Sequence, residues 1–564
     1  MKQKALFISA VAALALSSVA CSDEFFETSS KTTLNSETAY SNVATAEIAL
    51  VGCYDGWQAT ISNEGIGFYL TSEIAADECF AGQGVGDATN YYPVDEFDLT
   101  TYPSALASLF DTDWSNYYAA IYRCNSLLVN EDNIDWDGDE TTHGRVIGEC
   151  RGLRAVLYFD LVRLFGNIPL LTEPSSDNIP QSEPAEVFEV IVEDLLYAIE
   201  NIPADSYNGT TINTTDGRFS KYAAEALLAR VYLFYTGYYG AELSVTKSEV
   251  IDYLQDVIDN GGYELEEEYA NLWMPACTED ASTSDTYAWS TTYKGKYYNS
   301  DGWHSGYDGN LTKEYVLNLK FNSTQDYNGN LDGLCFQVYL GTRNVSQPPF
   351  ATGWGIANPN PRFVEEFEDD PRIEHSVVDY EAIGFEALSN FSNCTSDTRE
   401  YTGYGIKKFA PLCFSDGTRE SVGFELGAQH MNITYYLDWP IIRYADVLLM
   451  QAELTESATY LNEVQNARGA TVTSYSKENI IRERACEFAF EGIRYWDLLR
   501  YEQDGAYAAE KIAEMQDGVT VLTGGVEVKT TFDASNFTAK KGLMFIPSNE
   551  ITLSDNVLVQ NEGW

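Results

Sequence analysis

The middle of the chain combines aromatic rings with short polar side chains, a combination suited to binding sugars. A sugar ring has an apolar face of C–H groups and a rim of hydroxyls, so an aromatic ring can cover the face while polar side chains meet the rim. Trp303, Tyr307 and Trp354 stand in a segment rich in Asn, Ser, Asp and Gln. We therefore predict that these three rings contact a ligand, with Trp354 as the first candidate.

A second candidate surface comes earlier in the chain, at Asn90, Tyr91 and Tyr92. Two adjacent tyrosines beside an amide could form another ring platform. The competing interpretation is a structural one, since the chain has 39 Tyr, 27 Phe and 10 Trp, and most of these rings must fill the core.

Motifs for catalysis are absent from the sequence. It contains no GxSxG, HExxH, P-loop or kinase motif. Pairs of carboxylates could hydrolyse glycosides, but with 86 Asp and Glu residues such pairs arise by chance. A stretch from Asn133 to Gly138 resembles part of a calcium loop, yet its twelfth position is Gly144 rather than the required Glu. We expect neither an enzyme nor a cofactor.

The 10 cysteines stand singly, without a CxxC pair, and the 4 histidines show no metal-type spacing. Zinc sites and disulfide frameworks usually show such patterns. We therefore predict no metal site, and we expect most cysteines to be small buried apolar residues.

The N-terminus has the layout of a secretory signal. Lys2 and Lys4 precede a short apolar run, and small residues lead to Cys21. The run is too short to span a bilayer. The stretch Ser18-Val-Ala-Cys21 resembles a bacterial lipobox, which implies that residues 1–20 are removed and that Cys21 carries the lipid anchor. Residues 21–35 then form a flexible tether, and the acidic pair Asp23-Glu24 resembles a surface-export signal of Bacteroidetes lipoproteins.

Charge excludes one class of partner. The formal net charge is -52, and Lys and Arg form no basic stripe. Such a surface repels nucleic acid. A strongly acidic chain can also be intrinsically disordered, but disordered chains have few hydrophobic residues, and here they make up 45% of the sequence.

Hydrophobic periodicity predicts a mainly helical chain. The clearest case is 153–165, where apolar residues recur on one helix face before Gly166 and Pro169. Residues 278–434 lack such a period and are predicted to be loops with small strands, including 334–340. The last residues, 543–564, are predicted to be extended and turn-rich. The predicted helices are 39–57, 114–128, 153–165, 187–199, 222–235, 250–258, 441–455 and 478–501.

Five stretches, in order along the chain, resemble the SusD/RagB family of Bacteroidetes nutrient-binding lipoproteins. They are Arg151–Leu170, Gly217–Leu233, Ile442–Glu453, Glu483–Arg500 and Phe545–Trp564. The resemblance implies a scaffold of four tetratricopeptide-like helix pairs with irregular segments that build the ligand surface. It gives a helical region at 36–277, an irregular ligand-binding region at 278–435 and a C-terminal helical region at 436–564.

The resemblance also implies a function. Family members sit on the outer leaflet of the outer membrane and cap a SusC-like TonB-dependent transporter, to which they deliver oligosaccharides or, in the RagB branch, peptides. They are not enzymes. Trp354 falls where the starch-binding member places a ligand-contacting Trp, whereas Ala81-Gly-Gln-Gly84 stands where starch binders place another, which argues against starch.

The family's charged signature residues are expected to pair inside the scaffold, because buried charges need partners. These residues are Arg154, Asp160, Arg163, Arg443, Glu491, Arg494 and Asp497.

Overall fold

The computed structural model describes residues 39–62, 67–87, 89–205, 217–273, 276, 298–299, 302–303, 312–321, 334, 336–413, 419–420 and 438–564. Within these ranges, no helix combines the length and the apolar character that crossing a membrane requires.

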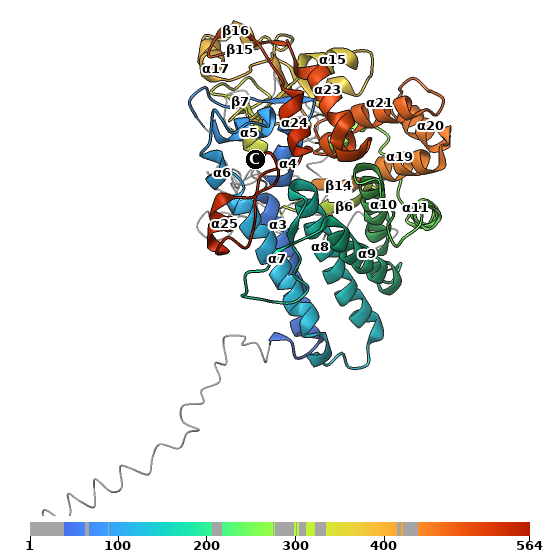
Figure 1. Cartoon of the computed structure of the whole chain (residues 1–564). Coiled ribbons are helices and arrows are strands. Elements are labelled where there is room, and N and C mark those ends of the chain that lie inside the picture. The colour runs from blue at the N-terminus through green and yellow to red at the C-terminus, as the bar shows by residue number, and fades with distance from the viewer. Residues whose placement is uncertain are drawn as a thin grey trace, which may run out of the picture.

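Four helix pairs form the scaffold (Figure 1). Within each pair the two helices pack along each other. Neighbouring pairs also touch, α3 and α7 against α8, α9 against α10, and α11 against α19. The predicted mainly helical fold with four helix pairs is therefore confirmed. The pairs are α3 (Val43–Ser62) with α7 (Asp111–Val129), α8 (Glu140–Phe165) with α9 (Pro184–Asn201), α10 (Lys221–Tyr238) with α11 (Lys247–Asn260), and α19 (Tyr444–Thr455) with α20 (Ala458–Ala467).

Helix α8 begins at Glu140, a residue that the sequence prediction missed by more than three turns. The side chain of Asp139 caps it by accepting the backbone N–H of Thr142, and Gly166 ends it with a positive φ of 70°. Gly144, Gly148 and Gly152 interrupt the apolar pattern of the first half, which hid this part of the helix from a search for hydrophobic periodicity.

The predicted helix 478–501 is wrong, because the chain breaks there into α21 (Lys477–Glu487) and α22 (Arg494–Arg500). Phe490 and Gly492 have positive φ values of 61° and 73°, which a helix cannot include. The backbone N–H of Gly492 donates to the buried carboxyl of Glu73 on α4 (Gly67–Ile74) at 2.6 Å. A tertiary contact therefore stabilises a break that the apolar periodicity does not show.

Two further segments differ from prediction. Residues 334–340 were expected to form a strand, but Phe336–Leu340 is the short helix α14. The first residues of the predicted helix 441–455 belong instead to β14 (Trp439–Arg443), which pairs with β6 (Tyr315–Leu319). Both segments are short and apolar, and periodicity alone does not separate strand from helix in such runs.

Short strands and helices occupy the rest of the irregular region, at the end of the molecule away from α8 and α9 (Figure 1). Among the described residues its sheets have two strands each, for example β1 (Cys79–Ala81) with β9 (Ala357–Pro359), β7 (Thr342–Arg343) with β8 (Thr352–Gly353), and β10 (Val377–Asp379) with β11 (Tyr404–Ile406). A separate small core lies beneath them, formed by residues such as Val345, Tyr380, Phe385 and Tyr401.

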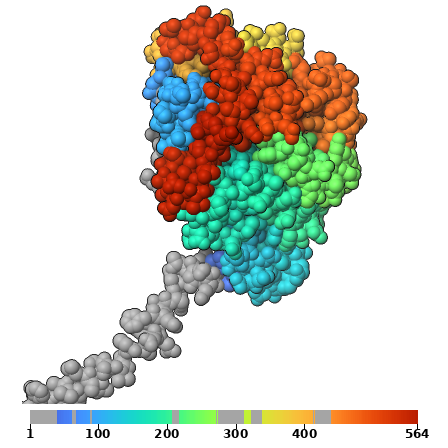
Figure 2. Space-filling view, viewed as in Figure 1, coloured from blue at the N-terminus to red at the C-terminus, as the bar shows by residue number. Residues whose placement is uncertain are grey.

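The C-terminal residues lie across the surface between the N-terminal helices and the loops (Figure 2). The backbone N–H of Met544 donates to the carbonyl of Leu164 at 2.7 Å, and the Asn561 amide donates to that of Phe165 at 2.8 Å. Trp564 packs against Phe545. Apart from the one-turn helix α25 (Ser548–Leu553), this segment is extended and turn-rich, as predicted.

The charged signature residues are buried and paired, as predicted. Arg154 on α8 forms two bonds of 2.8 Å with Asp194 on α9, and Arg494 forms two with Asp77. The largest network surrounds Arg443, whose guanidinium contacts three buried carboxylates. Lys408, from the irregular region, joins this network, and so fixes that region to the scaffold. The members are Arg372, Lys408, Arg443, Arg468, Glu314, Glu483, Glu487 and Glu491.

Candidate ligand-binding site

The pairing of β1 with β9 brings together two stretches that the sequence analysis treated separately. Cys79 lies opposite Pro359, and the backbone N–H groups of Gly82 and Gln83 donate to the carbonyls of Ile356 and Gly355 at 2.5 Å. We call residues 82–87 the early loop. This loop therefore lies directly beside the Trp354 segment.

Gly82 is required for this approach. A Cβ atom at this position would lie 2.2 Å from the carbonyl oxygen of Gly355 and 2.3 Å from the amide of Asn358. No side chain fits at position 82, because the backbone of this residue packs directly against the Gly355 segment.

Trp354 is half-buried and rests on a second ring. Its indole stacks on Tyr339 with centroids 4.8 Å apart and an angle of 29° between the planes. Its backbone N–H donates to the carbonyl of Val338 at 2.8 Å. The ring is therefore held rigidly while part of it stays open to solvent, which suits an aromatic platform because little entropy is lost on binding.

Charged and amide side chains are linked to the backbone of Trp354 through Arg343. Arg343 donates to Asp397 at 2.7 Å, to Asp87 of the early loop at 2.9 Å and to the carbonyl of Trp354 at 3.4 Å. The exposed Asn344 donates its amide to Asp397 at 2.8 Å. The side chains of Asp87 and Asp397 are 67% and 41% exposed, so their remaining acceptor positions face solvent. Hydroxyl groups of a ligand could donate to them.

Tyr91 and Tyr92 do not form the predicted platform, because they are only 8% and 1% exposed. Tyr92 instead supports the early loop from beneath: its hydroxyl donates to the carbonyl of Gly84 at 2.6 Å, and the guanidinium of Arg399 covers its ring at 4.0 Å. Burial raises the pKa of the Tyr92 phenol. Asn90 is half-buried next to them.

The other predicted site residues are only partly described. Trp303 lies in β5 (Gly302–Trp303), which pairs with β4 (Tyr298–Asn299), and only its backbone is placed. Tyr307 and Cys21 lie outside the described residues.

Sequence reasoning missed Tyr339, Arg343, Asn344, Asp87 and Asp397. Acidic residues are too common in this chain for single ones to stand out, and Tyr339 is one of 39 tyrosines. The pairing of β1 with β9, which assembles the site, joins residues far apart in sequence.

The structure therefore combines a scaffold of paired helices with a region of short strands and loops that holds a half-buried indole, and comparisons with known proteins identify this class of fold. The model of the SusD family matches residues 313–564. A second model, described as starch-binding associating with outer membrane, matches residues 71–233. The chain belongs to the SusD/RagB family.

Individual relatives and solved structures are more distant. A SusD-like protein of Bacteroides ovatus is 25% identical over 527 residues, which cover 89% of this chain and 83% of the relative. A laminarin-binding SusD-like protein is 25% identical with a TM-score of 0.68, covering 93% of this chain and 100% of that one. Surface glycan-binding protein A from Bacteroides thetaiotaomicron, solved with laminarihexaose, has the same fold at 20% identity and a TM-score of 0.67, covering 92% of this chain and 99% of that one.

Proposed function

We propose that this protein is a cell-surface glycan-binding lipoprotein that captures oligosaccharides and delivers them to a SusC-like TonB-dependent transporter of the outer membrane. The observation that carries the proposal is the half-buried indole of Trp354, which stacks on Tyr339. Arg343 links the Trp354 backbone to the exposed carboxylates of Asp87 and Asp397, and Asn344 donates to Asp397. A flat apolar ring beside exposed acceptors and amides matches the face and rim of a sugar.

The two carboxylates near Trp354 leave acceptor positions open to a ligand. Arg343 donates to both Asp87 and Asp397, whose side chains are 67% and 41% exposed. Their remaining oxygen lone pairs can accept hydrogen bonds from sugar hydroxyl groups.

Among possible glycans, β-glucans of the laminarin type come first. The laminarin-binding relative is one source of support. The early loop gives another, since Ala81-Gly82-Gln83-Gly84 carries no Trp where the resemblance places one in starch binders, and position 82 has no room for a side chain.

A titration of the chain carrying Cys21→Ala against laminarin, starch and other glycan fragments tests the proposal. We expect binding to at least one glycan and a loss of at least tenfold in affinity with Trp354→Ala, about 1.4 kcal/mol or more. Isothermal calorimetry provides the measurement.

Trp136→Ala is the matched control, because Trp136 is also half-buried and stacked, on His143, but lies in the helical region. It should leave affinity unchanged. Equal losses in both variants, or binding of peptides and of no glycan, would contradict the proposal.

The anchor and the transporter have separate tests. With Cys21→Ala, the chain should move from the membrane to the soluble fraction while keeping its glycan affinity. Affinity purification of the lipidated chain from detergent-solubilised outer membranes should bring down a large TonB-dependent β-barrel, identified by mass spectrometry. Recovery of the chain without such a barrel would contradict the proposed partnership.

A further inference from the structure

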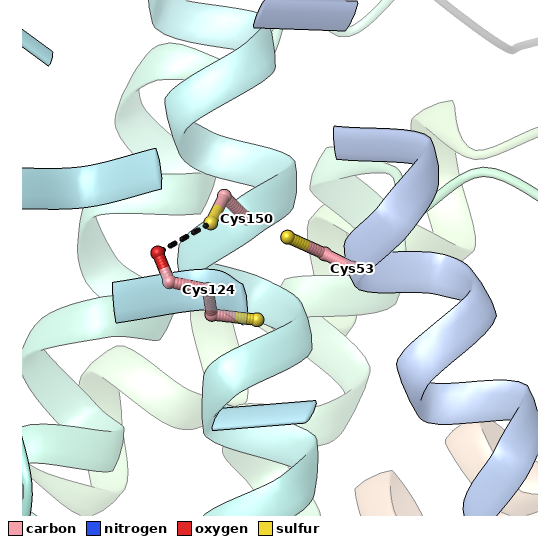
Figure 3. A group of neighbouring side chains, drawn as sticks. All are labelled: Cys53, Cys124 and Cys150. Atoms are coloured by element: carbon pink, nitrogen blue, oxygen red, sulfur yellow. Dashed lines mark hydrogen bonds between the residues drawn. The ribbon is translucent and has the colours of Figure 1, made fainter. Parts of the chain in front are cut away.

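Three cysteines from three different helices meet in the core of the scaffold. Cys53 on α3, Cys124 on α7 and Cys150 on α8 are each 0% exposed, and their sulfur atoms all lie within 4.8 Å of one another. In Figure 3 the side chains of Cys53 and Cys124 extend into the space between the helices, next to Cys150. No spacing in the sequence indicates this group, because each helix contributes one residue.

Two of the three residues are also in direct contact. The thiol of Cys150 donates to the backbone carbonyl of Cys124 at 3.5 Å, as the dashed line in Figure 3 shows. The thiolate is the form of cysteine that binds metal, so a thiol releases its proton when it becomes a metal ligand. Three sulfurs this close together can all reach one ion.

The geometry of the group suits a three-coordinate ion. An ion about 2.3 Å from each of three sulfurs in one plane requires sulfur atoms about 4.0 Å apart, which lies inside the observed limit. In the described part of the chain, no fourth His, Cys, Asp or Glu joins the three within that limit. Zinc usually takes four ligands, whereas thiolates select soft ions such as copper(I), which accepts three.

We propose that Cys53, Cys124 and Cys150 form a buried three-sulfur site for a soft, thiophilic metal ion, with copper(I) as the ion that fits it best. On binding, copper(I) forms three copper–sulfur bonds, the three thiols release three protons to solvent, and no electron is transferred. The charge of the group changes from zero to minus two, and the guanidiniums of Arg123 and Arg154 lie near enough to act on these sulfurs.

The site is independent of the glycan site. It lies among α3, α7 and α8, whereas Trp354 directly follows β8 and stacks on Tyr339 of α14. A bound ion would join three helices of the scaffold, and any ligand of the native state raises stability by mass action.

The test uses the Cys21→Ala chain, fully reduced and free of oxygen, both native and refolded from urea in the presence of copper(I). Competition against bicinchoninate should show one high-affinity copper(I) per chain. X-ray absorption should show three sulfur ligands at about 2.3 Å. The midpoint of thermal unfolding should rise with copper, while glycan affinity stays the same.

Substitutions assign the ion to these residues. Cys53→Ala and Cys124→Ala should each lower copper affinity at least a hundredfold, and Cys394→Ala, which removes another buried cysteine, should not. Absence of tight copper binding in both preparations, a spectrum with two sulfurs or with nitrogen and oxygen ligands, or equal loss in the Cys394 control would overturn the proposal. The X-ray absorption spectrum of the chain that keeps all three cysteines tests the proposal even if a cysteine variant fails to fold.

Discussion

Arginine–carboxylate pairs occur both in the scaffold and in the loops around Trp354, but they differ in how far they are exposed to water. In the scaffold, Arg443 is 2% exposed and all of its carboxylate partners are buried. In the loops, Arg343 pairs with Asp87 and Asp397, which remain largely open to water. Buried pairs fix one arrangement, because each charge depends on its partners. Exposed pairs contribute little to stability, and so leave hydrogen-bonding capacity for a ligand.

The largest effect on stability is expected from Arg443→Met, which removes the central cation of the buried network. The variant leaves Glu314, Glu487 and Glu491 without their shared cation, and we expect the free energy of unfolding to fall by about 3–5 kcal/mol. Lys313→Met is the control, since Lys313 pairs with Glu264 at the surface, and it should cost less than about 1 kcal/mol. Urea unfolding measures both. Similar losses in the two variants would show that burial does not distinguish these pairs.

A pH titration sharpens the account of the scaffold. Burial raises the pKa of Glu73 to about 8. In the unfolded chain this carboxyl ionises near its ordinary pKa. The free energy of unfolding of the wild type therefore falls as pH rises from about 4.5 to 8, because the unfolded state releases this proton and the folded state keeps it. We expect Glu73→Gln to be progressively more stable than the wild type over that range, by at most about 1.4 kcal/mol per pH unit. Urea unfolding at pH 5 and pH 8 checks the trend, and a difference independent of pH would contradict it.

Two glycine substitutions, one in the scaffold and one in the early loop, should differ in whether they lower stability or glycan affinity. Gly492→Ala places a Cβ 2.8 Å from the ring of Tyr69 at a positive φ, and should lower stability by about 1–3 kcal/mol while glycan affinity persists. Gly82→Ala pushes the early loop away from Gly355, and should lower glycan affinity more than it lowers stability. Isothermal calorimetry measures the glycan affinity of each variant, and urea unfolding measures its stability. Equal changes of affinity and of stability in the two variants would contradict this expectation.

The smallest effect on stability is expected from Asp397→Asn. Arg343 keeps its bond to Asp87, so the free energy of unfolding should change by less than about 1 kcal/mol. The lost acceptor should still weaken glycan binding several-fold, because the remaining amide offers fewer lone pairs to hydroxyl groups. Unchanged affinity would remove Asp397 from the proposed rim.

The sequence predicts the scaffold better than the site. Six of the predicted helices, from 39–57 to 250–258, correspond to α3 and α7–α11, because a helix that packs on one face repeats its apolar residues locally. The break at Gly492 and the start of α8 depend on contacts with Glu73 and with neighbouring helices, which local periodicity does not contain.

The site depends still more on distant contacts. Trp354 stands out in the sequence because Trp is rare and its neighbours are polar. Tyr339, which stacks on it, and Arg343 and Asp397, which form the proposed rim, are of common residue types. Their proximity, and that of the early loop that β1 and β9 bring close, appears only in the folded chain. The same limit applies to the three cysteines, whose proximity follows from helix packing alone.

The glycines of α8 have a consequence for how such proteins diversify. Gly144, Gly148 and Gly152 recur every four residues, and a Cβ at each would approach Asn201, Ile202 or Phe219 to within 3 Å. A larger residue at any of the three would have to displace the end of α9 or the segment that leads into α10, so substitutions there should be destabilising. If the proposed function holds, a change of ligand is therefore reached more easily by substitutions in the loops, which leave the helical packing intact.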